Sequence, residues 1–284
     1  MWRAILALAT ALLALPGAAQ ASDRFFVTSD GVRLHYIDAG PAAAPTLLFV
    51  PGWTMPAWIF NRQLAFFSAR YHVVALDPRG QGDSDIPPSG SEPYRRGADI
   101  ADLVATLGGR PVTLVGWSLG VLDILSYVHQ YGDLQLSALV LIDNSVGEDP
   151  APVPSPRPPT RRGPPPARAL AMERFVASMF HRKQDPAFLA RLTQVALRTP
   201  PDASAALLAY PVPRSFWRDA IYAVRRPILY VVTPHLSGQA GNLATRHADV
   251  QADVYADAGH ALFIDDGDRF DAEMLGFLQS RVRP

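Results

Sequence analysis

The feature that most constrains the fold is a serine placed between an apolar strand and an apolar helix. Residues 111–115 form a β-branched, apolar run, and the sequence Gly116-Trp117-Ser118-Leu119-Gly120 follows it directly. An apolar helical stretch then extends from Leu119 to about Tyr131. This G-x-S-x-G pattern is typical of a sharp strand-to-helix turn that exposes the serine Oγ, and its glycines let the strand and helix approach closely.

Short apolar runs alternate with helical stretches along the chain, which predicts a mostly parallel sheet flanked by helices. The turn signal Ser29-Asp30-Gly31 predicts an antiparallel hairpin at the start of the sheet. The predicted strands are residues 25–28, 32–38, 46–50, 72–76, 112–115, 138–142, 228–232 and 253–256. Besides the helix at 119–131, helices are predicted after the turn at 51–53 to about 68, at 98–107 and at 269–282.

The connection between Ile142 and Ile228 is far longer than an ordinary crossover, so we expect it to form a cap. Residues 150–166 contain nine prolines, which predicts either a stiff extended linker or a disordered segment. Helical character follows at 167–180, 186–198 and 203–210. The predicted organisation is a core at 22–144, a Pro-rich linker and helical cap at 145–225, and the rest of the core at 226–284.

Residues 1–21 have the pattern of a signal peptide. Arg3 precedes an apolar stretch from Ala4 to Leu15, and Ala19-Gln20-Ala21 matches a small-residue cleavage site. The alternative is a membrane anchor, but the stretch is shorter than the ~20 residues that span a bilayer. We therefore expect an exported protein, periplasmic or extracellular, with no stable membrane insertion after cleavage.

Composition excludes several classes of function. The chain of 284 residues is 49% hydrophobic, enough for a sizeable core, and its net charge of zero with no long basic run argues against a nucleic-acid partner. The absence of cysteine excludes disulfides, thiolate metal sites and a cysteine nucleophile. No sequence feature implies a metal or an organic cofactor.

A serine hydroxyl needs a base within hydrogen-bond reach before it can act as a nucleophile, and histidine has the suitable pKa. His260 is the candidate, because it follows the last predicted strand at the same sheet edge as Ser118. The other histidines are interpreted as packing or surface residues: His35, His72, His129, His181, His235 and His247.

Four motifs, in this order, resemble those of the α/β-hydrolase superfamily. They are the Pro51-Gly52-Trp53 turn, the loop from Asp77 to Ser84 (D-x-R-G-x-G-x-S), the serine motif and Gly259-His260. The resemblance covers essentially all of the mature sequence, and the Gly-Trp-Ser-Leu-Gly form is similar to that of small esterases and acyl-lactone hydrolases. It implies an α/β-hydrolase fold with a helical cap between the sixth and seventh strands.

The glycine-rich loop at 77–84 is interpreted as structural, because it lacks the G-x-G-x-x-G pattern and the P-loop lysine. In this fold the donors to a developing oxyanion are backbone N–H groups, which we assign to Leu119 and Trp53. Pro51 replaces the histidine usual in the family's oxyanion loop, yet the N–H of Trp53 remains available. The alternative is that Trp53 has only a packing role. The two roles are compatible, because one uses the backbone N–H and the other uses the ring.

The acid that orients the base is assigned to Asp143. The family usually places it after the strand that is here 228–232, but residues 233–237 contain no carboxylate. Asp143 directly follows the strand at 138–142 and preserves the order serine, acid, histidine. The alternative is that Asp143 only caps the end of the strand; we prefer the catalytic role, because the base needs an orienting partner. An Asp143 oxygen should then lie within ~2.6–3.2 Å of a His260 ring nitrogen.

The predicted activity is cleavage of a carboxylic ester or ester-like bond, in a small or acyl ester or a lactone, through an acyl-enzyme intermediate. Ser118 argues against the superfamily branches that use an aspartate nucleophile. C–C bond hydrolysis and perhydrolysis use the same machinery, and a non-catalytic ligand-binding protein is a further alternative. Trp53, Met55, Trp58 and Trp117 indicate either an apolar acyl pocket or core packing.

Overall fold

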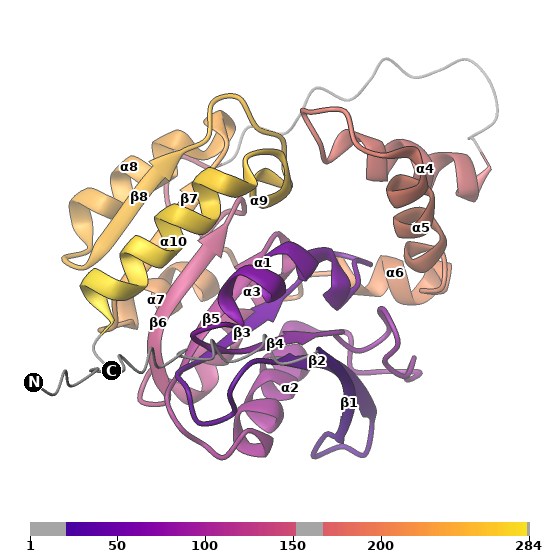
Figure 1. The fold of residues 1–284 in the computed structure, drawn as a ribbon, viewed down its shortest axis with the longest axis horizontal. Coiled ribbons are helices and arrows are strands. Elements are labelled where there is room, and N and C mark those ends of the chain that lie inside the picture. Colours follow the sequence, from indigo (N-terminus) through magenta and orange to yellow (C-terminus); the bar gives the residue numbers. More distant parts are fainter. Residues whose placement is uncertain (1–20, 152–166, 283–284) are drawn as a thin grey trace, which may run out of the picture.

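The computed structural model describes residues 21–151 and 167–282, and an eight-stranded sheet lies at its centre (Figure 1). The strand order is β1-β2-β4-β3-β5-β6-β7-β8. β2 pairs antiparallel with both β1 and β4, and all other neighbours are parallel. The strands are β1 (Ser22–Val27), β2 (Arg33–Ala39), β3 (Thr46–Val50), β4 (His72–Leu76), β5 (Val112–Trp117), β6 (Leu136–Ile142), β7 (Ile228–Val232) and β8 (Val250–Val254).

Helices cover both faces of the sheet. Apolar side chains of α2, α3, α7 and α8 pack in one core cluster with one sheet face, and those of α1, α9 and α10 pack in a second cluster with the other. The helices are η1 (Ala57–Phe60), α1 (Asn61–Phe67), α2 (Pro93–Thr106), α3 (Leu119–Tyr131), α4 (Arg168–Ser178), α5 (Pro186–Ala196), α6 (Pro201–Leu207), α7 (Ser215–Ala223), η2 (Pro234–Leu236), α8 (Ser237–Arg246), α9 (Leu262–Asp265) and α10 (Gly267–Arg281).

The predicted fold class is confirmed, and β3, β4, β7 and α3 have the predicted bounds. Other bounds differ, among them the starts of β1 (Ser22 instead of Phe25), α2 and β8. α2 begins at Pro93 instead of Ala98, because proline is well suited to the first turn of a helix. β8 begins at Val250 instead of Asp253, since it pairs with β7 from Ile228 onward, and its half-buried residues give a weak apolar signal.

The predicted cap lies between β6 and β7, and Figure 1 shows α4, α5 and α6 grouped at one side of the sheet. The cap is shorter than the predicted range 145–225, because α7 packs against α3 in the core. The segment 152–166, with most of the Pro-rich stretch, and residues 1–20 of the predicted signal peptide lie outside the described residues. Within 21–151 and 167–282, no helix is both long enough and apolar enough to cross a membrane.

Polar contacts fasten the cap to the core beside the carboxyl edge of the sheet. Thr199, between α5 and α6, donates its hydroxyl to the carbonyl of Gly80 at 2.7 Å. Trp53 donates its indole N–H to the carbonyl of Ser204 on α6, also at 2.7 Å. The loop at 77–84 and the turn after β3 therefore hold the cap over the edge where β5 ends.

Candidate active site

Ser118 lies between β5 and α3 with φ 55° and ψ −121°, a backbone conformation that non-glycine residues seldom adopt. Its N–H donates to the carbonyl of Ile142 at 3.0 Å. The flanking glycines make the turn feasible: a Cβ on Gly120 would lie 2.2 Å from the carbonyl oxygen of Val50, and one on Gly116 would lie 2.7 Å from that of Gly120. Only glycine fits at either position.

The three side chains expected to meet at this edge do so. Nε2 of His260 lies 2.8 Å from Oγ of Ser118, and Nδ1 lies 2.7 Å from Oδ2 of Asp143. The Asp143 side chain has no exposed surface, whereas that of His260 is 32% exposed. The contact predicted between Asp143 and His260 is therefore present, and the imidazole faces the hydroxyl on one side and the carboxylate on the other.

Asp143 follows β6 with φ 47°, and contacts with β7 hold it there. Its N–H donates to the carbonyl of Val231 at 2.9 Å. Its Oδ1 accepts both the N–H and the hydroxyl of Thr233, each at 2.7 Å. Thr233 directly follows β7, in a segment without a carboxylate, and the sequence did not reveal that it contacts the acid at the end of the neighbouring strand.

Asp265 fixes the loop that carries His260. Its Oδ2 accepts the N–H of Gly259 at 2.8 Å and the N–H of His181 in the cap at 2.6 Å. The indole N–H of Trp117 donates to the carbonyl of His260 at 2.8 Å. The base is therefore held through its backbone by Trp117 of the core and through the preceding glycine by Asp265 at the end of α9, which also binds His181 after α4.

Asn144 is a second residue that sequence reasoning missed. Its Nδ2 donates to the carbonyl of Ser118 at 2.7 Å, and its own carbonyl accepts the hydroxyl of Tyr230 at 2.8 Å. Burial, with a smaller effect from the charge of Asp143, raises the pKa of Tyr230 well above its ordinary value, so the phenol remains a neutral donor. An amide directly after the acid was the available signal.

The turn after β3 passes directly against the serine. A Cβ on Gly52 would lie 2.9 Å from the Cβ of Ser118, so the backbone leading into Trp53 is in contact with that side chain. Gln81 accepts the N–H of Thr54 through Oε1. Across residues 21–151 and 167–282, no protein group accepts the N–H of Trp53. Leu119 is the first residue of α3, so its N–H has no acceptor within the helix.

The four side chains suggested for an apolar pocket divide into two kinds. Met55 and Trp117 are buried in the core, at 0% and 1% exposure. Trp53 and Trp58 are partly exposed and contact cap residues, with ring centroids 5.0 Å from Phe175 and 6.0 Å from Phe188 respectively. Of the four, Trp53 and Trp58 therefore lie at the boundary between core and cap.

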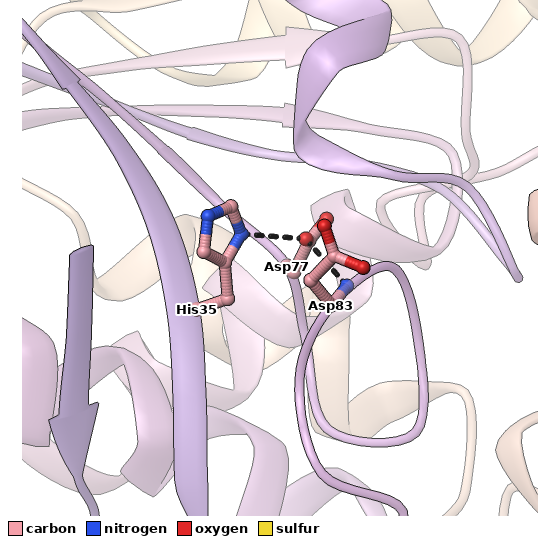
Figure 2. Close-up of side chains that lie close together, drawn as sticks. All are labelled: His35, Asp77 and Asp83. Atoms are coloured by element: carbon pink, nitrogen blue, oxygen red, sulfur yellow. Dashed lines mark hydrogen bonds and ion pairs between the residues drawn. The ribbon is translucent and has the colours of Figure 1, made fainter. Parts of the chain in front are cut away.

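A second polar cluster contains His35, Asp77 and Asp83, whose ligand-type atoms lie within 4.8 Å of one another (Figure 2). Its central carboxylate already accepts several hydrogen bonds. Asp77 accepts the N–H of Ala57 at 2.5 Å through Oδ1 and the N–H of Asp83 at 2.8 Å through Oδ2, which also lies 2.7 Å from Nδ1 of His35. These bonds account for the cluster as a structural support of the loop at 77–84.

The remaining charged residue of that loop is also engaged by protein groups. Arg79 is buried and donates from Nε and Nη2 to the carboxylate of Asp99, both at 2.6 Å. It also contacts Asp30: burial raises the pKa of Asp30, but hydrogen bonds from Arg79 and Thr28 outweigh it and lower the pKa to about 2. The loop therefore serves to tie together β2, α2 and the cap.

Comparisons with known proteins match most of the chain to one family. Residues 47–273 match the profile of the alpha/beta hydrolase family. The chain is 34% identical to a non-heme chloroperoxidase of Streptomyces lividans over 40% of this chain and 42% of that protein. It is also 34% identical to a bifunctional esterase/perhydrolase of Acinetobacter calcoaceticus over 42% of this chain and 43% of that protein. The matched segment thus spans less than half the length of these relatives.

Solved structures resemble the chain over nearly its whole length. An esterase from Rhodococcus sp. ECU1013 superposes with a TM-score of 0.75 and 24% identity, covering 92% of this chain and 99% of that one. An enol-lactonase from Burkholderia xenovorans LB400 superposes with a TM-score of 0.73 and 20% identity, covering 90% and 100%. At this level of identity the likeness establishes the fold.

Proposed function

Because the chain belongs to the α/β hydrolase family, we propose that it is a serine-dependent hydrolase that cleaves a carboxylic ester or ester-like bond through an acyl-enzyme. One observation carries the proposal: the hydrogen-bonded series of Ser118, His260 and Asp143, with Ser118 at a strained and partly exposed turn. That arrangement activates a hydroxyl for attack on an acyl carbon.

In the first half of the reaction, Nε2 of His260 takes the proton of the Ser118 hydroxyl as Oγ attacks the carbonyl carbon of the substrate. Asp143 accepts the Nδ1 hydrogen, which fixes the tautomer and stabilises the imidazolium that forms. The imidazolium then gives its proton to the leaving alcohol, and the acyl group stays on Oγ. Water, deprotonated by the same imidazole, releases the acid and restores the serine.

The tetrahedral intermediates carry negative charge on the former carbonyl oxygen. We assign its stabilisation to the N–H groups of Leu119 and Trp53, both without an acceptor among the described residues of the protein. Gly52 and Gln81 support this assignment, since the first brings the turn against Ser118 and the second holds the N–H of Thr54, the residue after Trp53. No metal or cofactor takes part in these steps.

The relatives support an ester as substrate, since they include an esterase/perhydrolase and, among solved structures, an esterase and a lactonase. Perhydrolysis is a second candidate, favoured by the similarity to the esterase/perhydrolase. It differs only in the group that attacks the acyl-enzyme, hydrogen peroxide instead of water. Comparing peracid and acid release from one ester separates the two activities.

Labelling with a fluorophosphonate probe tests the serine mechanism, because only an activated serine reacts. We expect peptide mass spectrometry to place the adduct on Ser118, and Ser118→Ala to abolish labelling. Ser126→Ala is the matched control: this serine lies on α3, the helix that begins directly after Ser118, but its hydroxyl donates to the carbonyl of Pro93. A folded protein that neither reacts with the probe nor hydrolyses a panel of esters and lactones would instead fit the ligand-binding alternative.

We also propose that the chain is exported, on the strength of the signal-peptide pattern in residues 1–21. The mature protein should then begin at Ser22, the first residue of β1. Mass spectrometry of the N-terminus, after expression of the full sequence in a bacterial host, measures this directly. Recovery of intact Met1 in the membrane fraction would contradict it.

A further inference from the structure

Thr233 contacts the far side of the carboxylate that orients His260. Its N–H and its hydroxyl both donate to Oδ1 of Asp143, whereas His260 lies against Oδ2. Thr233 is 6% exposed, and the Asp143 side chain is fully buried, so water does not readily replace either bond. Charge-assisted bonds of this kind are stronger than bonds between neutral groups.

The hydroxyl of Thr233 has a further neighbour, Nδ1 of His235, at 2.7 Å. A threonine hydroxyl has one hydrogen, and here it is donated to Asp143, which as a carboxylate can only accept. Nδ1 of His235 must therefore carry a hydrogen and donate it to Oγ1 of Thr233. This bond turns the threonine hydroxyl toward the acid.

We propose that Thr233 is a positioning residue for the reaction and that His235 orients the threonine hydroxyl. This inference rests on the proposed function. A carboxylate rotates readily about its last torsion. Two donors on Oδ1 fix that rotation and leave Oδ2 aimed at His260. A chain of contacts then runs from the exposed ring of His235 through Thr233, Asp143 and His260 to Ser118.

The proposal predicts a change in pH dependence. The titratable groups around Asp143 are His260, His235 through Thr233, and Tyr230, which burial keeps neutral. Without the threonine hydroxyl, more of the carboxylate charge is available to the imidazolium of His260. Protonated His260 is then more stable, and the acidic limb of the kcat/KM profile moves to higher pH.

The test compares Thr233→Val, Thr233→Ser and Thr46→Val in the full-length protein with a p-nitrophenyl ester as substrate. Thr233→Val should lower kcat by about 10-fold with little change in KM, and should move the acidic limb upward. Thr233→Ser keeps the hydroxyl and should restore both. Thr46→Val is the matched control, because Thr46 is 5% exposed and its hydroxyl also contacts a histidine, His72, but at the opposite end of the strands.

The remaining outcomes are decisive. If Thr233→Val does not fold, His235→Ala provides the second test, with kcat lowered about 3-fold at unchanged KM; an unchanged kcat overturns the proposal. Wild-type kcat and pH profile in folded Thr233→Val also overturn it. If Ser118→Ala is inactive while folded Thr233→Val behaves like the wild type, the serine mechanism stands and only the role of Thr233 is refuted. An active Ser118→Ala refutes the proposed function itself.

Discussion

Among the residues that the structure describes, two histidine–aspartate pairs have the same Nδ1–Oδ2 distance and different surroundings. His260 with Asp143 and His35 with Asp77 each place Nδ1 2.7 Å from Oδ2. The second nitrogen of His260 faces the hydroxyl of Ser118, whereas that of His35 faces Asp23 at 3.1 Å. The His260 side chain is 32% exposed and that of His35 is 4% exposed.

The difference shows that the pair alone does not make a base. Burial lowers the pKa of His35, but hydrogen bonds and charge from Asp77 and Asp23 outweigh it and raise the pKa. An imidazole between two carboxylates therefore tends to hold its proton. His260 meets one carboxylate and one hydroxyl that has a proton to give, and Ser118 is partly exposed.

The largest effect should come from removing the hydroxyl of Ser118, which faces His260 and has no counterpart beside His35. Ser118→Ala should lower ester hydrolysis by roughly 10⁵-fold, because the oxyanion donors and substrate binding alone leave a small residual rate. Steady-state kinetics with p-nitrophenyl acetate measures this, and circular dichroism should show an unchanged fold. Turnover within about 10-fold of the wild type would refute Ser118 as nucleophile.

Exchanging each aspartate for asparagine sharpens the comparison between the pairs. Asp143→Asn should lower kcat by up to about 10⁴-fold with little loss of stability, because the amide favours the wrong tautomer of His260. Asp77→Asn should instead lower the free energy of unfolding by about 1–3 kcal/mol, because the N–H groups of Ala57 and Asp83 compete for one remaining acceptor oxygen.

Kinetics and urea denaturation of both variants give the two readouts. The contrast between the pairs would be lost if folded Asp77→Asn lost activity as severely as Asp143→Asn. Asp143→Asn with most of its activity would show that another group orients His260, and the serine mechanism would then need a different acid.

The glycines of the loop at 77–84 test how tightly the structural pair is enclosed. A Cβ on Gly82 would lie 2.0 Å from the carboxylate of Asp77, and the residue also has φ 53°. Gly82→Ala should therefore cost about 2–4 kcal/mol of unfolding free energy. Gly80→Ala is the matched control, because its φ is 75° but its Cβ would contact nothing within 4 Å, so only about 1 kcal/mol of backbone strain is expected. Equal costs for the two would mean that the carboxylate moves aside.

Much of the site follows from local sequence. The strand-turn-helix pattern places Ser118, and the rule that parallel strands end at one edge brings Asp143 and His260 to it. Thr233 and Asn144 could not be found in this way, because their roles depend on hydrogen bonds across strands that are distant in sequence. A second His–Asp pair was missed for the same reason, since His35 and Asp77 meet only when β2 pairs with β4.

The helices α7 and α8 were also missed. α8 contains Gly238 and Gly241, which weaken the apolar periodicity that marks a helix. α7 was absorbed into the predicted cap, because it follows the Pro-rich stretch and no pattern within 145–225 distinguishes a helix that packs on the core. The packing of α7 against α3 is a tertiary fact, and the sequence of either helix alone does not reveal it.

The smallest expected effect concerns the pH dependence of stability at the structural pair. The pKa of His35 is raised in the folded protein, so protonation stabilises the fold. This contribution is fully present below the unfolded pKa of about 6.5 and is lost as pH rises through the folded value.

His35→Gln removes the titrating group, so the wild type should lose stability relative to this variant as pH rises above neutrality. Urea midpoints of both proteins between pH 5.5 and 9 measure the difference, and Asp77→Asn should weaken the slope because it removes one of the charges that raise the pKa. A difference that stays constant, or grows with pH, would show that His35 does not hold a proton between its two carboxylates.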